Sequence, residues 1–140
     1  MKKVILLIFF FNSFSSLFGQ SNPLEKAINV YLIKLAEQNN QKLDTLFVSY
    51  ENKELEVYHK NIVANTFIKS VDYPEGDSKI VLFIDLAKDK NFRQIILNEK
   101  TVKYTEGTQS YKVFSSSSIS IKFKYKKGCW KYINYHVNAL

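Results

Sequence analysis

The stretch ISIKFKYKKGCWKYINYHV, residues 119–137, alternates apolar and polar side chains on both sides of Lys127 and Gly128. Such alternation is typical of strands with one buried face, and glycine supplies the positive φ that a two-residue hairpin turn needs. The stretch therefore predicts a β-hairpin. Its register places large side chains opposite one another, with Tyr125 facing Trp130, Phe123 facing Tyr132 and Ile121 facing Asn134. Aromatic cross-strand pairs of this kind stabilise a sheet by roughly 0.2–1 kcal/mol each.

The other face of this hairpin is basic. Four lysines share it: Lys122, Lys124, Lys126 and Lys131. Lys124 falls opposite Lys131, and directly opposed like charges destabilise a hairpin. Either solvent and nearby carboxylates such as Glu54 and Glu56 relieve this repulsion, or an anionic partner does, in which case Lys112 is a further contact. Nucleic acid is the poorer candidate, because single-strand binding surfaces carry aromatic and basic groups on one face.

The chain preceding these strands begins with an amphipathic helix. Asn22 is a suitable N-cap, and Pro23 suits the first helical position. Apolar residues then recur at spacings of four, three and four: Leu24, Ile28, Tyr31 and Leu35. This stripe predicts a helix of about four turns that ends in the polar run 38–41.

The later segments are expected to form strands and turns. The segment KIVLFIDL, residues 79–86, is nearly all apolar and predicts a central strand covered on both faces. The other expected strands are 45–50, 54–58, 62–71, 101–104, 109–114, 119–126 and 129–137, and 92–97 fits a strand or a short helix. One helix and about six to eight strands predict an α+β domain with a curved antiparallel sheet packed on the helix. Cystatin-like and NTF2-like folds share this outline, and a β-sandwich with an outer helix is the alternative.

Residues 1–21 have the layout of a secretory signal peptide. Lys2 and Lys3 precede an apolar run of eight residues, 4–11, which is shorter than the about 20 apolar residues of a membrane-spanning helix. Small residues follow at Gly19 and Ser21, and cleavage after either one fits. We expect export to the periplasm or the exterior of a bacterial cell, and a single domain over residues 22–140.

Charge is distributed unevenly along the expected mature chain. Residues 21–100 hold 11 basic and 12 acidic groups, whereas residues 101–140 hold seven lysines and one acid, Glu106. The chain has a single cysteine, Cys129, which excludes an internal disulfide. The hydrophobic core must therefore stabilise the fold even in an oxidising compartment.

The sequence does not assemble a catalytic or metal-binding set. Cys129 and His136 are seven residues apart, so a regular strand places them on opposite faces and about 20 Å apart. One cysteine and two histidines lack the paired spacing of zinc sites, and the acidic loop 72–78 lacks the spacing of calcium loops. We expect no metal and no cofactor.

These observations favour a small exported binding or interaction module without catalytic activity. Its candidate partners are an acidic protein, a glycan or a membrane surface. One alternative is a small-ligand carrier or enzyme with a pocket between helix and sheet, lined by Tyr31, Tyr58, Asp85 and Tyr104. Asp85 interrupts an apolar strand, which suits a pocket carboxylate, although an ion pair with Lys88 or Lys90 explains it as well. A secreted inhibitor or immunity-type protein is the other alternative.

Overall fold

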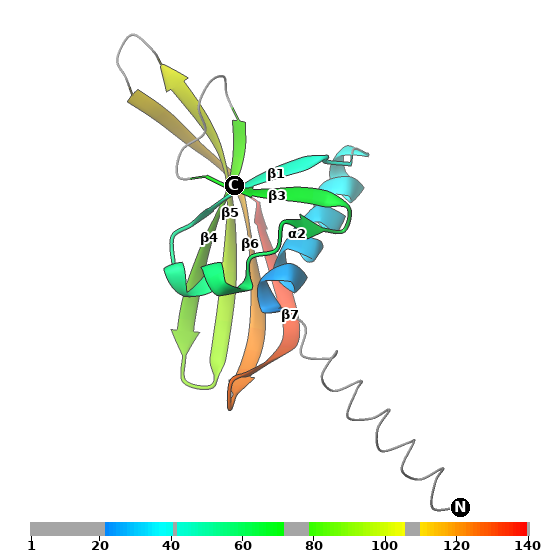
Figure 1. Cartoon of the computed structure of the whole chain (residues 1–140), viewed down its shortest axis with the longest axis vertical. Helices are drawn as coiled ribbons and strands as arrows, with labels where there is room; N and C mark the ends of the chain where they lie inside the picture. Colours follow the sequence, from blue (N-terminus) through cyan, green and yellow to red (C-terminus); the bar gives the residue numbers. More distant parts are fainter. Residues whose placement is uncertain (1–21, 41, 72–78, 106–109, 140) are drawn as a thin grey trace, which may run out of the picture.

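The computed structural model describes residues 22–40, 42–71, 79–105 and 110–139 (Figure 1). The expected signal peptide, residues 1–21, and the acidic loop, residues 72–78, lie outside the described residues, as do the side chains of Tyr104 and Lys112. The described part contains one α-helix, one short 3₁₀ helix and seven strands. The expectation of an α+β fold is confirmed.

Helix α2, Pro23–Asn39, begins and ends where the sequence predicts. The side-chain oxygen of Asn22 accepts hydrogen bonds from the backbone N–H groups of Leu24 and Glu25, at 3.0 and 3.1 Å. These bonds satisfy two of the donors that every helix start leaves open. Asn40 stops the helix in the left-handed conformation, with a φ of 52°. The buried face carries three residues of the predicted stripe, Leu24, Ile28 and Tyr31, together with Ala27, and Leu35 is only partly buried.

The seven strands form one sheet in the order β2-β3-β1-β4-β5-β6-β7. Their bounds are β1 Thr45–Tyr50, β2 Ile62–Val63, β3 Thr66–Ser70, β4 Lys79–Asp89, β5 Phe92–Thr105, β6 Ser110–Lys126 and β7 Cys129–Ala139. Strand β1 runs parallel to both neighbours, β3 and β4, whereas the other pairs are antiparallel. The expectation of a purely antiparallel sheet is therefore wrong. The connection from β1 to β3 is long enough to return the chain in the same direction, as a parallel pair requires.

The sheet curls into a half-barrel, and α2 lies against its concave side (Figure 1). Almost fully buried side chains fill the space between them: Leu24 and Ile28 of α2, Leu82 and Ile84 of β4, Ile95 and Leu97 of β5, and Ile121 and Phe123 of β6. The described strands make a single sheet, so the sandwich alternative is wrong. Strand β4 is central in this sheet, as predicted, but only part of it is covered on both faces: Val81 and Leu82 are both fully buried, whereas Ile80 is 50% exposed and Phe83 is half-buried.

Residues 54–58 form no strand, contrary to the prediction. They belong to the 3₁₀ helix η1, Lys53–Tyr58, where the side chain of Asn52 accepts a hydrogen bond from the Glu54 N–H at 2.9 Å. Residues three apart share a face of a 3₁₀ helix, so Leu55 and Tyr58 both turn toward the core while Val57 is exposed. The alternation of acidic and apolar residues predicted a strand, but in the structure these residues follow the three-residue period of a 3₁₀ helix.

The hairpin of β6 and β7 has the predicted turn and most of the predicted register. Lys127 and Gly128 both have positive φ, 52° and 76°, as in a type I′ turn. Tyr125 pairs with Trp130, Phe123 with Tyr132 and Lys124 with Lys131. A bulge at Ile133 then shifts the register, so Ile121 pairs with Tyr135 and the predicted pair with Asn134 is wrong. Beyond the bulge Tyr135 and Val137 therefore lie on the concave side, together with Trp130 and Tyr132.

Candidate binding site

The four lysines of the predicted basic face lie together on the convex side of the hairpin. We call Lys122, Lys124, Lys126 and Lys131 the lysine face. The first three alternate along β6 with the buried residues Ile121 and Phe123, and Lys131 is the direct cross-strand partner of Lys124. Lys124, Lys126 and Lys131 are exposed, and Lys122 is half-buried.

No ion pair among the described residues involves the lysine face. The two carboxylates that the sequence offered as neighbours are engaged elsewhere, since Glu54 pairs with Lys88 and Glu56 pairs with Lys53. Lys122 has a partner within the described part of the chain, because its Nζ lies 4.4 Å from the centre of the Phe92 ring. Opposed lysines without a carboxylate raise the local positive potential, which attracts anionic partners.

Lys112 lies farther along β6, where its backbone pairs with Lys103 of β5. The register shows no cross-strand pairing between Lys112 and β7, which pairs with residues 117–126 of β6. Lys112 is therefore separated from the lysine face along the strand, and its side chain lies outside the described residues.

Strand β7 is an edge of the sheet along its whole length. The opposite edge, β2, has only two residues, whereas β7 has 11. Large side chains of β7 are partly exposed as well: Tyr132, Ile133, Tyr135 and Val137. Two of them lie under lysines of α2, with Lys26 over the Tyr132 ring and Lys34 over the Tyr135 ring. A long edge strand carries a row of backbone donors and acceptors that another strand can pair with.

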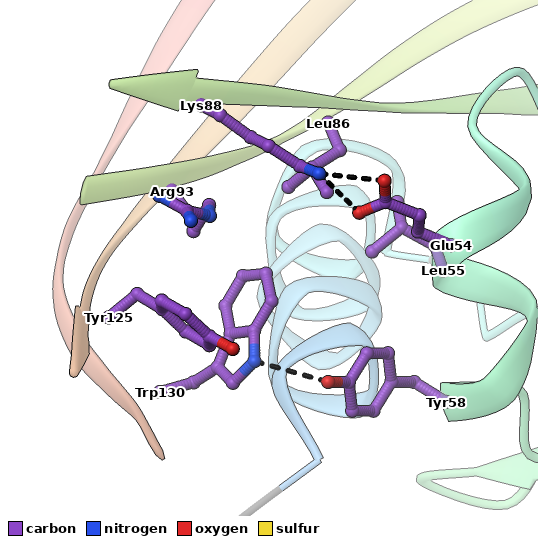
Figure 2. A pocket seen from close by; sticks show the side chains of 8 residues that line it. All are labelled: Glu54, Leu55, Tyr58, Leu86, Lys88, Arg93, Tyr125 and Trp130. Atoms are coloured by element: carbon purple, nitrogen blue, oxygen red, sulfur yellow. Dashed lines mark hydrogen bonds and ion pairs between the residues drawn. The ribbon is translucent and has the colours of Figure 1, made fainter. Parts of the chain in front are cut away.

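A cavity of about 120 Å³ lies on the concave side, at the end of the sheet where the β4–β5 and β6–β7 hairpins turn (Figure 2). Helix η1 covers it from the opposite side with Glu54, Leu55 and Tyr58. The sheet contributes five residues: Leu86 and Lys88 of β4, Arg93 of β5, Tyr125 of β6 and Trp130 of β7.

The residues expected to line a pocket do not converge. Tyr58 lines this cavity, and its hydroxyl accepts a hydrogen bond from Trp130 Nε1 at 3.2 Å. Asp85 alternates with the core residues Ile84 and Leu86, so its side chain points to the convex side, where Oδ1 accepts from the Leu86 N–H at 2.8 Å. Tyr31 lies elsewhere, on α2, and the side chain of Tyr104 is outside the described residues.

Two buried tyrosines have polar partners away from the cavity. The Tyr31 hydroxyl donates to Glu99 Oε2 at 2.7 Å. Burial, and then the hydrogen bond and charge of Glu99, raise the pKa of Tyr31 well above its ordinary value. The Tyr50 hydroxyl lies 2.5 Å from His59 Nδ1, and burial together with the charge of Glu56 raises the pKa of Tyr50. Both hydroxyls are held protonated and structural rather than presented to solvent.

Sequence reasoning missed Arg93 and Trp130 as cavity residues. Each was a detectable signal, because Arg93 is the only arginine among the chain's 20 basic residues and Trp130 is its only tryptophan. Their meeting depends on β5 and β7 reaching the same end of the sheet, which spacing along the chain does not reveal.

Cys129 and His136 do not form a dyad, although the predicted reason is only half right. Because the bulge at Ile133 changes the parity of β7, both residues lie on the convex side, opposite Lys126 and Ser120 respectively. The six-residue interval between those partners corresponds to about 20 Å along a strand. Within the described part of the chain no group of three or more metal-ligating side chains occurs.

No helix among the described residues is both long and apolar enough to cross a bilayer. A scan against protein-family models and searches of curated proteins and of solved structures found no match to this chain.

Proposed function

We propose that this chain is an exported binding module without catalytic activity, which holds an extended acidic segment of a partner protein along the β6–β7 hairpin. The export part rests on the signal-peptide pattern of residues 1–21. The same proposal retains the cystatin-like or NTF2-like outline, which a helix inside a half-barrel supports. The observation that carries the binding part is the lysine face, placed beside an open edge strand.

The charge of the partner follows from the lysine face. Lys124 and Lys131 oppose each other with no ion pair to any described residue. Carboxylates of an acidic partner would attract both lysines and offset the repulsion between them. Both effects stabilise the complex relative to the free protein. Such attraction also speeds association and weakens with salt.

The extended shape of the partner follows from β7. A strand added to this edge gains main-chain hydrogen bonds along up to 11 residues. Its alternate side chains would stand beside Lys131 on the convex side and beside Tyr132 on the concave side. A glycan or a lipid headgroup can use the lysines but cannot use the backbone edge, and this favours a protein segment.

The proposal is tested with a fluorescent peptide of about ten residues in which glutamate alternates with valine or threonine, long enough to span β7. We expect saturable binding that weakens as salt rises. The double variant Lys124→Glu, Lys131→Glu should weaken it by about tenfold or more and flatten the salt dependence. The matched control Lys42→Glu, Lys69→Glu changes the net charge equally with two exposed lysines away from the hairpin, and it should bind nearly as well as the wild type.

A second peptide, N-methylated on consecutive backbone nitrogens so that both of its edges are blocked, separates strand addition from charge attraction alone. It keeps every side chain but cannot form a full ladder, so its binding should be much weaker. Equal binding of the two peptides would remove β7 from the site, and equal loss in the two double variants would remove the lysine face. Tight binding of heparin or of anionic vesicles without peptide binding would replace the protein partner by a polyanion.

A further inference from the structure

Three aromatic side chains, Tyr58, Tyr125 and Trp130, form one wall of the concave cavity, and their contacts with one another fix their orientation. Trp130 packs edge-to-face against three rings, with centres 5.3 Å away for Tyr125, 5.6 Å for Phe123 and 5.8 Å for Tyr58. Its Nε1 donates a hydrogen bond to the Tyr58 hydroxyl, which fixes the orientation of the indole ring (Figure 2). A wall fixed in advance costs a ligand little ordering on binding.

The cavity also carries one positive charge with which no carboxylate of the described residues forms an ion pair. Lys88 is paired with Glu54, with Nζ 2.5 and 2.7 Å from the two carboxylate oxygens. Arg93 has no ion pair with the described residues, and its guanidinium carbon lies 4.5 Å from the centre of the Tyr125 ring. The ionised lining residues thus leave a net charge of one unit, on Arg93.

The remaining donors of Arg93 suit a carboxylate. Nη1 donates to the backbone oxygens of Lys90 and Phe92, at 3.1 and 2.9 Å, which anchors the side chain. Nε and Nη2 have no hydrogen-bond partner among the described residues, and this pair of parallel N–H groups is the geometry that binds a carboxylate through both oxygens. The Tyr58 oxygen accepts from Trp130, so its own proton remains available to donate, and no acceptor for that proton occurs among the described residues.

The cavity volume limits the size of a ligand. About 120 Å³ is close to the roughly 150 Å³ of an apolar cavity that accepts benzene, so one six-membered ring is near the upper limit. We propose that this cavity binds a small aromatic monocarboxylate, with the carboxylate on Arg93 and the ring against Trp130 and Tyr125. This site is independent of the lysine face, because it lies on the concave side of the same hairpin.

Benzoate is the probe, and the emission of Trp130 is the readout, since it is the only tryptophan in the chain. We expect a saturable change with a dissociation constant on the order of 1 mM, as befits so small a ligand. Benzamide, which has the same shape without the charge, should bind about tenfold more weakly or worse.

Two variants with opposite expected effects on benzoate affinity test the role of charge. Arg93→Gln should weaken benzoate binding by about tenfold or more. Glu54→Gln releases Lys88 from its ion pair and adds a positive charge to the lining, so it should strengthen binding several-fold. Lys69→Gln removes the same charge as Arg93→Gln at an exposed lysine of β3, away from the cavity, and should leave the affinity unchanged.

Three results would overturn the proposal: no saturable response to benzoate, equal affinity for benzoate and benzamide, or Arg93→Gln binding as tightly as the wild type while remaining folded by circular dichroism. Should Arg93→Gln fail to fold, the sign of the Glu54→Gln effect decides, because weaker or unchanged binding contradicts an anion site. These outcomes are separate from those of the acidic-peptide test, in which Lys124 is essential and Arg93 is not.

Discussion

Tyr31 places its hydroxyl inside the core, where the carboxylate of Glu99 accepts a hydrogen bond from it. The side chain of Tyr31 is almost fully buried. The pKa of Tyr31 is therefore raised in the folded state and returns to its ordinary value near 10 in the unfolded chain. Above pH 10 the unfolded chain releases this proton while the folded protein retains it, so stability is complete below pH 10 and falls as the pH rises further.

We predict that Tyr31→Phe changes the alkaline stability profile. At neutral pH the variant should lose about 1.5–3 kcal/mol of unfolding free energy, the usual value of a hydrogen bond to a charged group. Above pH 10 its unfolding free energy should fall less steeply than that of the wild type, by about 1.4 kcal/mol per pH unit, because the titrating proton is gone. Urea unfolding between pH 7 and pH 11.5 measures both effects. Parallel alkaline slopes for the two proteins would show that Tyr31 does not carry the linkage.

At the scale of single elements, the β6–β7 turn contains one residue, Gly128, that suits the local backbone conformation and one, Lys127, that does not. Both turn residues have positive φ, which glycine adopts freely and lysine does not. Gly128 has no atom within 4 Å of the position that a Cβ would occupy, so any cost of a side chain there is conformational and not steric.

Substitutions at the turn should therefore act with opposite signs. Gly128→Ala should lower the unfolding free energy by about 1 kcal/mol, because alanine at positive φ is strained. Lys127→Asn should raise it by about 0.5 kcal/mol, since Asn-Gly is the preferred type I′ pair. Thermal or urea unfolding of the two single variants checks both values. The same sign for both would mean that side-chain contacts, and not φ, govern the turn.

The elements that sequence reasoning located correctly are those whose signals are local. The α2 stripe and the Asn22 cap lie within one helix, and the hairpin register follows from one glycine-containing turn. The bulge at Ile133 was missed although the sequence carries a local signal for it: the large apolar residues stand at positions 130 and 132 and then at 133, 135 and 137, which is the change of parity that a bulge produces. Helix η1 was missed because its conformation depends on tertiary packing. Leu55 is fully buried in the core, and this contact favours a 3₁₀ helix over the strand that the alternation predicts.

At the scale of the whole molecule, the candidate sites differ in how far they depend on tertiary structure. The lysine face needs only two adjacent strands, so its four members were predictable from alternation alone. The cavity needs η1, β4, β5, β6 and β7 to meet at one end of the sheet. Its residues are separated by up to 76 positions, from Glu54 to Trp130, and the parallel pairing of β1 that positions η1 there has no local signal.

The packing of α2 against the half-barrel predicts that helix and sheet unfold together. One apolar layer joins them, without a disulfide among the described residues, so removing part of it should destabilise both. Ile28 is 1% exposed and Ile33, on the same helix, is 50% exposed. Ile28→Ala should cost about 2–5 kcal/mol and lower Tm by about 10 °C or more, whereas Ile33→Ala should change the unfolding free energy by less than about 1 kcal/mol. Far-UV circular dichroism follows the helix and Trp130 fluorescence follows the far end of the sheet, and in Ile28→Ala both signals should shift by the same amount. A shift of the helical signal alone would mean that α2 detaches from a sheet that remains folded, and the chain would then contain two cooperative units rather than one.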